Sequence, residues 1–276
     1  MDHANFKSGT MANRKHLPLL VMKFGGAALS GPKNIKAAAQ RIIEKLKSYQ
    51  VIVVVSAMGD ETDRLIEMTK GISDSAHLAK NLAEIDTVLA SGEQVAAGLM
   101  ALALSLQGAA ARSFLAHQLP IVTDGNFSDG QILQVETRKL TESLDNGIIP
   151  VVAGFQGVDD EGRLVTLGRG GSDTSAVFIA AALGAETCEL YKDIDAVYSE
   201  DPRRVPTAER YRFLSYAEME QIATREPQIL HHKAVAMAKL RQIRLHVRSA
   251  FKDISGTIIE TPIMKITKIK MEEASA

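Results

Sequence analysis

The chain has 276 residues, a formal net charge of −1 at pH 7 and one cysteine, Cys188. This length allows one large domain or two small ones with a real core, and the near-neutral charge argues against nucleic acid or an anionic membrane as the main partner. One cysteine excludes an internal disulfide and a cysteine-ligated zinc site, as is typical of a reducing compartment. No apolar run approaches the roughly 18 residues of a membrane span, and residues 1–16 lack the apolar core of a signal peptide. We therefore expect a cytoplasmic protein that acts on small molecules and binds neither a membrane nor nucleic acid.

Apolar runs alternate with longer amphipathic stretches along the chain. Because aromatic residues make up 5% of the chain and tryptophan is absent, we expect a core of Ala, Val, Ile and Leu, as in parallel strands covered by helices. The alternation predicts an α/β fold, a three-layer αβα sandwich with a mainly parallel central sheet. Strands are expected at 17–24, 51–59, 113–117, 119–124, 148–157, 185–193 and 243–249, with a hairpin at 158–167. Helices are expected at 32–48, 62–71, 77–107 with a break near Ser91–Gly92, 137–147, 214–225 and 227–242, and after the loop at 167–171.

The first segment that carries chemistry is "KFGG", at the end of the first predicted strand. Gly25 and Gly26 let backbone N–H groups approach a phosphate, and Lys23 supplies a positive charge. The segment is not a P-loop, because the pattern G-x-x-x-x-G-K-[ST] is absent. The residues alone leave open a tight strand–helix turn with an incidental lysine.

Two further segments place polar side chains where a ligand is expected. Ser56 lies toward the carboxyl end of the second predicted strand, and ligands of open α/β sheets bind at such ends. Thr62 and Asp63 either face that ligand or cap the next helix. Glu93 stands in an otherwise apolar helix, where a carboxylate is costly unless it is paired, for example with a substrate ammonium group. The alternative is that Glu93 lies on a solvated stripe of the helix.

The stretch "TLGRGGSDTSAV" is the strongest local signal. Its three glycines permit close backbone approach and positive φ values. Ser172 is expected to cap the helix that follows, whose N-terminus attracts anions. Arg169 offers a planar fork for a carboxylate or a phosphate, and Asp173 can hold a lysine or a metal. A capped turn without further function would explain Ser172 and Asp173 but not Arg169.

Acidic residues and histidines elsewhere in the chain do not predict a metal site. Residues 189–204 contain several acids, but their spacing fits no EF-hand, and a loop that wraps a nucleotide would use the same residues. His231 and His232 are adjacent on a predicted helix, so their side chains face different directions and make a poor zinc pair.

Taken in order, these segments resemble the catalytic domain of aspartokinases, within the amino acid kinase superfamily. The resemblance extends from about 19 to about 259 through "KFGG", "VVVSAMGDETDRL", "SGEQVAAGL", "GFQGVDDEGRLVTLGRGGSDTSA", "YKDIDAVYSEDPR" and "HVRSAFKDISGTII". It implies phosphorylation of the aspartate side-chain carboxylate to 4-phospho-aspartate, with ATP and Mg²⁺, by a homodimer formed through the catalytic domain. It also implies one kinase domain at 19–262, with an acid-binding lobe at about 19–150 and a nucleotide lobe at about 151–262. Tails are expected at 1–18 and 263–276. Family members continue into paired ACT regulatory domains where this sequence stops, so we expect either a catalytic-only kinase without these domains or a trimmed sequence, and feedback control is not predicted from these residues.

The resemblance assigns roles to residues of this chain. Lys23 would stabilise the transferring phosphoryl group, and Asp173 would organise that lysine. Glu93 would bind the substrate ammonium group and Arg169 its α-carboxylate, with Ser56, Thr62 and Ser172 lining the same pocket. ATP would be bound by Lys23, Gly25, Gly26, Lys192, Asp193, Tyr198 and Arg203.

The chain departs from the family pattern near the predicted phosphate site. Ala27 and Ala28 replace two hydroxyl residues, Gln228 replaces a lysine that reaches the ATP phosphates, and Lys192 replaces a serine or threonine. Lys192 or Lys233 is hypothesised to restore the lost charge. Two alternatives therefore accompany the aspartokinase interpretation: a kinase for another amino acid or small carboxylate, and a non-catalytic nucleotide-binding homologue.

Overall fold

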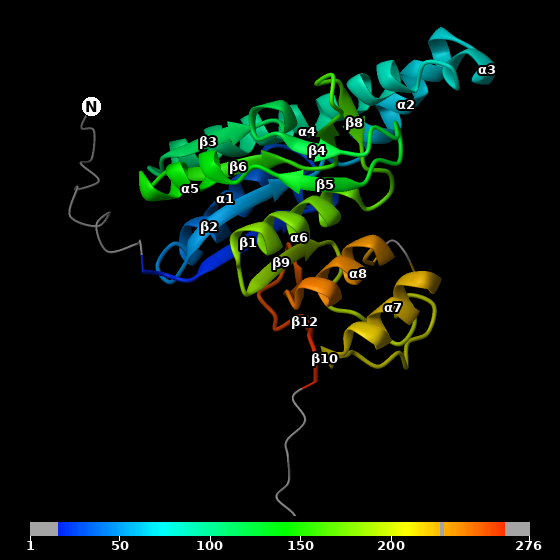
Figure 1. Ribbon diagram of the computed structural model, residues 1–276. Helices are drawn as coiled ribbons and strands as arrows, with labels where there is room; N and C mark the ends of the chain where they lie inside the picture. The colour runs from blue at the N-terminus through cyan, green and yellow to red at the C-terminus, as the bar shows by residue number, and fades with distance from the viewer. Residues whose placement is uncertain (1–15, 227–228, 263–276) are drawn as a thin grey trace, which may run out of the picture.

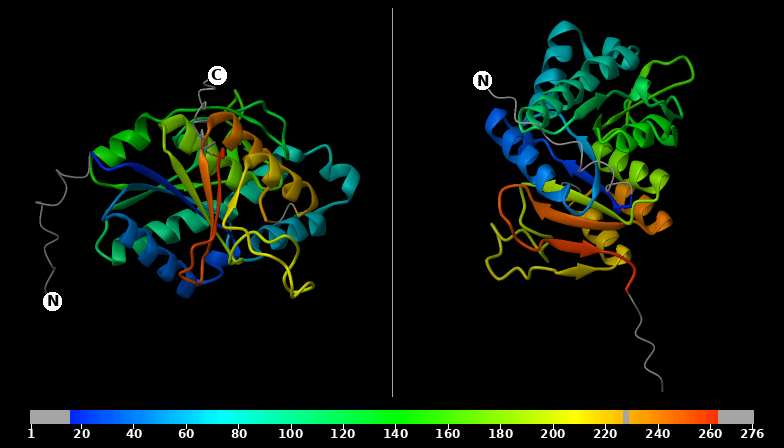
Figure 2. Two further views of the ribbon diagram at one scale, coloured as in Figure 1. Left: turned by 90° about the horizontal axis from the view of Figure 1, so that it is seen from below. Right: turned by 90° about the vertical axis from the view of Figure 1, so that its left-hand side faces the viewer.

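A large, mainly parallel sheet runs through the middle of the chain, with helices on both faces (Figures 1 and 2). The computed structural model describes residues 16–226 and 229–262. The predicted tail at 263–276, most of the predicted tail at 1–18, and Gln228 lie outside the described residues. The three-layer α/β architecture predicted from the sequence is confirmed.

The large sheet has eight strands in the order β10-β12-β11-β9-β1-β2-β6-β3. Neighbouring strands are parallel except for β11 and β12, which are antiparallel. The strands are β1 (Leu19–Phe24), β2 (Gln50–Val55), β3 (Ala111–Phe114), β6 (Ile149–Ala153), β9 (Thr187–Lys192), β10 (Phe213–Leu214), β11 (Arg244–Ser249) and β12 (Thr257–Ile259). The central strands β1 and β2 are buried on both faces, which explains their continuous apolar sequence.

Alternate side chains of β1 and β2 enter two separate hydrophobic cores. Leu20, Met22 and Phe24 pack against α1 (Pro32–Lys45) and α4 (Leu82–Leu106) on one face. Val21 packs on the other face with residues of α5 (Arg138–Asp145), α6 (Gly171–Leu183), α7 (Tyr216–Arg225) and α8 (His232–Arg241). The predicted capping box at the start of α7 is present, with Ser215 and Glu218 bonded reciprocally.

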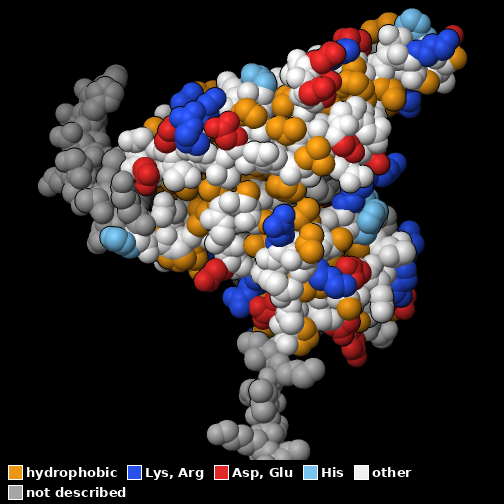
Figure 3. Space-filling model, in the orientation of Figure 1, with side chains coloured by type: hydrophobic (Ala, Val, Ile, Leu, Met, Phe, Trp, Pro, Cys, Tyr) orange, Lys and Arg blue, Asp and Glu red, His pale blue; other side chains and the backbone are white. Residues whose placement is uncertain are grey.

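A second, four-stranded sheet adjoins the first and has the order β5-β4-β7-β8. Its strands are β4 (Ile121–Thr123), β5 (Ile132–Val135), β7 (Gln156–Val158) and β8 (Leu164–Thr166), and β7 and β8 form the predicted hairpin. The remaining helices are η1 (Ala27–Leu29), α2 (Glu61–Ile72), α3 (Ser75–Leu78) and η2 (Ala116–Gln118). In Figure 1, α2 and α3 project from the body of the molecule. Basic and acidic side chains are interspersed over the face shown in Figure 3, in keeping with the near-zero net charge.

Helix α4 is continuous, so the predicted break near Ser91–Gly92 is wrong. A Cβ atom at Gly92 would lie 2.8 Å from the Cβ of Ala57, which shows that the glycine serves close packing against the segment after β2. By length and composition α4 is also apolar enough to cross a membrane, contrary to the sequence expectation, but half of its most apolar window is buried inside the protein. One face of α4 is therefore a core face, while the other face carries exposed apolar side chains.

The segment predicted as one strand at 148–157 is divided between the two sheets. Strand β6 ends at Ala153, and β7 begins at Gln156 in the smaller sheet. Between them a Cβ atom at Gly154 would lie 2.9 Å from the Cβ of Ser172, and Phe155 adopts a left-handed φ of 66°. Strands β5, β10 and β12 were not predicted, and α8 begins at His232, later than expected.

Candidate active site

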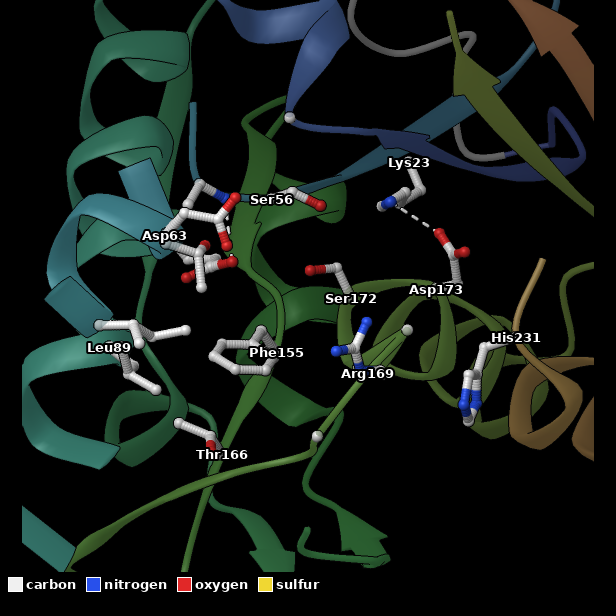
Figure 4. A pocket seen from close by; sticks show the side chains of 18 of the residues that line it. Lys23, Ser56, Asp63, Leu89, Phe155, Thr166, Arg169, Ser172, Asp173 and His231 are labelled. Carbon is white, nitrogen blue, oxygen red and sulfur yellow. Dashed lines mark hydrogen bonds and ion pairs between the residues drawn. The ribbon is translucent and has the colours of Figure 1, made fainter. Parts of the chain in front are cut away.

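A cleft of about 630 Å³ opens beside the carboxyl ends of β1, β2 and β9 (Figure 4). Parallel strands end at the same edge of a sheet, so Lys23, Ser56 and Lys192 are brought together although they are distant in the sequence. Helices α2 and α4 and the loop before α6 supply the other walls. Of the residues predicted for the site, the cleft is lined by Lys23, Gly26, Ser56, Thr62, Glu93, Arg169, Ser172, Asp173 and Lys192.

Asp173, in the first turn of α6, holds two lysines. Lys23 Nζ lies 2.6 Å from Asp173 Oδ1, and Lys192 Nζ lies 2.8 Å from Asp173 Oδ2. The side chains of Lys23, Asp173 and Lys192 are only 6%, 4% and 12% exposed. The cluster therefore carries an excess of positive charge in a largely water-free place.

Charge and burial shift the pKa values of this cluster. Burial lowers the pKa of Lys23 against the opposing attraction of Asp173, and the charge of Lys192 lowers it further. Burial alone would raise the pKa of Asp173, but the charges and hydrogen bonds of Lys192 and Lys23 keep it below its usual value. Asp173 is thus ionised at neutral pH, and this end of the cleft is suited to an anion.

The glycine-rich loop before α6 brings three parts of the wall together. Gly168 and Gly170 have left-handed φ values of 68° and 70°, and a Cβ at Gly170 would lie 2.1 Å from the Cβ of His231. Gly170, and not Ser172, occupies the N-cap position of α6, so the predicted serine cap is wrong. Because the helix begins at Gly171, Ser172 falls in its first turn, and Figure 4 shows its side chain in the cleft near Arg169.

Glu93 lies on the buried face of α4, so the alternative of a solvated stripe is excluded. The residue is 3% exposed, and its Oε1 accepts a hydrogen bond of 2.9 Å from the backbone N–H of Ala57. Its Oε2 has no hydrogen-bond partner among the described residues. Burial raises the pKa of Glu93 to about 7, although the Ala57 N–H acts in the opposite direction. An unpaired carboxylate oxygen in a cleft wall is a place for a ligand cation.

Arg169 is the exposed cation of the cleft. Within the part of the chain that the structure describes, its guanidinium has no hydrogen bond or ion pair. Figure 4 shows it beside Ser172, between the Lys23–Asp173 pair and the wall that contains Phe155. A free guanidinium with this placement can bind a carboxylate of a ligand through two parallel hydrogen bonds.

Four of the predicted nucleotide residues do not line the cleft. The N–H of Gly25 donates a 3.0 Å hydrogen bond to the C=O of Tyr191, so this amide is committed to the backbone. Asp193 and Tyr198 lie farther along the segment after β9. Arg203 is 86% exposed and pairs with Asp201. A role for these residues toward a nucleotide stays a prediction.

Sequence reasoning missed Asp86, which holds two walls of the cleft in place. Asp86 is fully buried on α4 and accepts hydrogen bonds from the N–H and hydroxyl groups of Ser128 (2.8 and 3.1 Å) and of Thr166 (2.7 and 2.8 Å). Ser128 and Thr166 both line the cleft. The available signal was position: Asp86 precedes Glu93 by seven residues, on the same face of an apolar helix.

The start of α8 contributes a second wall that was not predicted. His231, which lines the cleft, is the N-cap of α8, and its Nδ1 accepts from the Lys233 N–H at 3.4 Å. Burial lowers the pKa of His231, and the charges of His232 and Lys233 add to this shift. The ammonium group of Lys233 is paired with Asp129 Oδ1 at 2.5 Å and is not part of the cleft lining.

Comparisons with known proteins show the family of the chain. A sequence profile of the amino acid kinase family matches residues 18–249. The aspartokinase of Thermus thermophilus is 40% identical over 253 residues, covering 91% of this chain and 62% of its own length. The crystal structure of aspartate kinase from Synechocystis superposes with a TM-score of 0.75 at 39% identity, over 88% of this chain and 40% of that one. The structure of E. coli aspartokinase III in complex with aspartate and ADP has a TM-score of 0.77 at 23% identity, over 90% of this chain and 65% of that one, and so shows the fold alone. The chain spans less than two thirds of the length of the curated relatives it matches.

Proposed function

The chain belongs to the amino acid kinase family, and on that premise we propose that it transfers the γ-phosphoryl group of ATP to the side-chain carboxylate of aspartate. Relatives that are 40–45% identical are named aspartokinases, and this supports aspartate as the acceptor.

One observation carries the proposal: the cleft presents the complement of an amino acid next to the complement of a phosphoryl group. The unpaired Oε2 of Glu93 suits an ammonium group, and the free guanidinium of Arg169 suits an α-carboxylate. The Lys23–Asp173–Lys192 cluster lies in the same cleft and suits a phosphate. An amino acid that is bound through both its ammonium group and its α-carboxylate directs its side chain toward the lysines.

The reaction needs no general base. The acceptor carboxylate has a reference pKa of about 3.9 and is ionised at neutral pH. One of its oxygens forms a bond to the γ-phosphorus while the bond from that phosphorus to the β–γ bridging oxygen breaks, and ADP leaves with the electron pair. The task of the protein is therefore to position the two reactants and neutralise charge, which the ammonium group of Lys23 and the N-terminus of α6 do here.

Mg²⁺ is proposed to arrive with the nucleotide. Among residues 16–226 and 229–262, no group of three or more His, Cys, Asp or Glu side chains gathers in a way that could hold a metal ion. The carboxylate of Asp173 is already shared by two lysines. This donor set fits an ion that is held mainly by ATP phosphates, where it neutralises phosphate charge.

Several finer assignments belong to the proposal. We place the acid mainly in the lobe at about 19–150 and the nucleotide in the lobe at about 151–262, with Asp193, Tyr198 and Arg203 on the nucleotide side. A cytoplasmic location is likewise proposed.

A homodimer is also part of the proposal, and an exposed apolar stripe on α4 supports it. The spacing of the stripe is heptad-like, as is typical of a helix-pairing surface, and its residues are Val95, Leu99, Leu102 and Leu106.

The test is a coupled trapping assay. The protein is incubated with Mg-ATP, hydroxylamine and one amino acid at a time, because an acyl phosphate reacts with hydroxylamine to give a hydroxamate. We expect hydroxamate with aspartate and none with glutamate or asparagine. Product with another acid alone would replace aspartate as the substrate, and nucleotide binding without any product would favour a non-catalytic homologue.

A further inference from the structure

The cluster around Asp173 contains one cation more than its carboxylate needs. Lys23 already pairs with Oδ1 of Asp173 at 2.6 Å, and Lys192 occupies Oδ2 at 2.8 Å. Burying a second ammonium group beside the first is costly, because both are largely removed from water and repel each other. A purely structural partner for Asp173 would require only one of the two lysines.

We propose that Lys192 is a second phosphate-binding group, which leaves Asp173 and binds the γ-phosphoryl group beside Lys23 when the nucleotide enters the cleft. The inference rests on the proposed function for its ligand, and it adds a residue whose usual counterpart in the aspartokinase pattern has no charge. In the absence of ligand, the ion pair with Asp173 holds the Lys192 ammonium group in the cleft, beside Lys23.

The sheet places Lys192 correctly for this role. Lys192 is the last residue of β9, and β9 pairs in parallel with β1, where Phe24 is aligned with Tyr191. The two ammonium groups are held by the two oxygens of a single carboxylate, so both lie within reach of the oxygens of a single phosphoryl group. Lys192 also lines the cleft directly. A γ-phosphoryl group spreads its charge over three oxygens during transfer, which gives each lysine an oxygen to bind.

The other basic residues of the cleft do not fill this role. Arg169 is exposed and lies beside Ser172 (Figure 4), and its proposed ligand is the α-carboxylate of the acceptor. Nδ1 of His231 accepts a hydrogen bond from the Lys233 N–H, and burial lowers the pKa of the imidazole, which disfavours its charged form. Lys233 is bound to Asp129. Among the cleft residues that the structure describes, Lys192 is the cation that accompanies Lys23.

The test compares Lys192→Met with Lys192→Arg and with a matched control, Lys45→Met. Lys45 also pairs with a buried carboxylate, that of Glu189, at 2.6 Å, but it lies outside the cleft lining. Isothermal titration measures the binding of Mg-ADP, of the Mg complex of a non-hydrolysable ATP analogue, and of aspartate to each full-length variant. Thermal unfolding of each variant reports whether the fold is retained.

We expect Lys192→Met to lower the affinity for the ATP analogue at least about tenfold, as for the loss of one charge-assisted hydrogen bond. The affinities for ADP and aspartate should change much less. Lys192→Arg restores part of the loss, because the guanidinium keeps the charge. Lys45→Met leaves all three affinities unchanged, even where its melting temperature falls. Unchanged analogue affinity in Lys192→Met, or an equal loss for analogue, ADP and aspartate, would overturn the proposal.

The outcomes separate this proposal from the proposed function. If the wild-type chain binds the analogue but forms no hydroxamate with aspartate, the acceptor assignment fails while the Lys192 measurement still decides its own question. If the wild-type chain binds no adenine nucleotide, both fail together. If the wild-type chain forms the hydroxamate and Lys192→Met binds the analogue normally, the Lys192 proposal alone fails.

Discussion

Replacing Glu93 by glutamine is expected to stabilise the protein at alkaline pH while removing its affinity for the acceptor. Oε1 of Glu93 accepts from the Ala57 N–H, whereas Oε2 has no partner among the described residues, and burial raises the pKa of the carboxyl to about 7. Glutamine keeps the acceptor oxygen for Ala57 and removes the charge. The substitution therefore separates the cost of the buried charge from the fold.

The magnitude follows from the shift in pKa. In the unfolded chain a glutamate titrates near 4.3, so the folded state binds the proton more tightly than the unfolded state. A group with a raised folded pKa contributes stability that is complete below the unfolded value and is lost as the pH rises through the folded value. Between pH 4.3 and pH 7 the wild type should thus lose about 3 kcal/mol of unfolding free energy through this group, and Glu93→Gln should not.

The decisive measurement is the unfolding free energy at pH 5 and pH 8, by denaturant titration of the two proteins. The difference between Glu93→Gln and wild type should change by about 3 kcal/mol in favour of the variant between these pH values, whatever constant offset the amide introduces. Glu84→Gln is the matched control, since Glu84 is an exposed residue of the same helix. A parallel pH dependence in Glu93→Gln and wild type would refute the reasoning.

Binding of the acceptor should improve as the pH rises, whereas the stability contributed by Glu93 falls. Only the ionised carboxylate attracts the acceptor ammonium group, so the KM of the wild type for aspartate should fall about tenfold from pH 6 to pH 8. In Glu93→Gln this KM should be raised about a hundredfold or more, because a buried charge partner is lost, and it should no longer follow that pH dependence. A larger effect on the KM for ATP than on that for aspartate would contradict the role of Glu93.

Three further substitutions test separate parts of the structure. Arg169→Ala should raise the KM for aspartate at least about tenfold and leave the KM for ATP nearly unchanged, while the control Arg163→Ala, on the neighbouring hairpin, should change neither value. A larger rise in the KM for ATP than in that for aspartate would assign the loop to the phosphates. Asp86→Ala should lower the unfolding free energy by about 3 kcal/mol, because buried donors of two residues lose their acceptor; a loss below about 1 kcal/mol in denaturant titration would show that they find other partners. If α4 forms the dimer surface, Leu102→Glu should be a monomer in size-exclusion chromatography with light scattering. The control Leu240→Glu, at a similarly exposed site on α8, should remain a dimer, and a dimeric Leu102→Glu would place the interface elsewhere.

Most of the site residues that the sequence predicted line the cleft, because their signal was local. Ser56 stands just after an apolar strand, and Lys23 and Lys192 stand at or near the ends of two others. The carboxyl ends of parallel neighbours must meet at one edge, so strand assignment alone brings these side chains together. Glu93 was found by a related argument, since a carboxylate in an apolar helix needs a reason to be there.

Other features were beyond the reach of local patterns, because they depend on contacts between segments distant in the sequence. Gly92 resembles a helix breaker, yet it permits close packing on Ala57 within a continuous helix. The short strand β12 has three residues and is held by its pairing with β11 and β10 rather than by its own propensity.

By itself, the sequence of this protein determined the α/β layers, the edge of the sheet where the site lies and the residue types that line it, because these follow from hydrophobic periodicity and from strand ends. The tertiary structure alone decided which groups touch: that Asp173 is shared by Lys23 and Lys192, that one oxygen of Glu93 stays unpaired, and that the amide of Gly25 is used by the backbone. Distances of a few ångströms set these interactions, and they are fixed only when distant segments pack against one another.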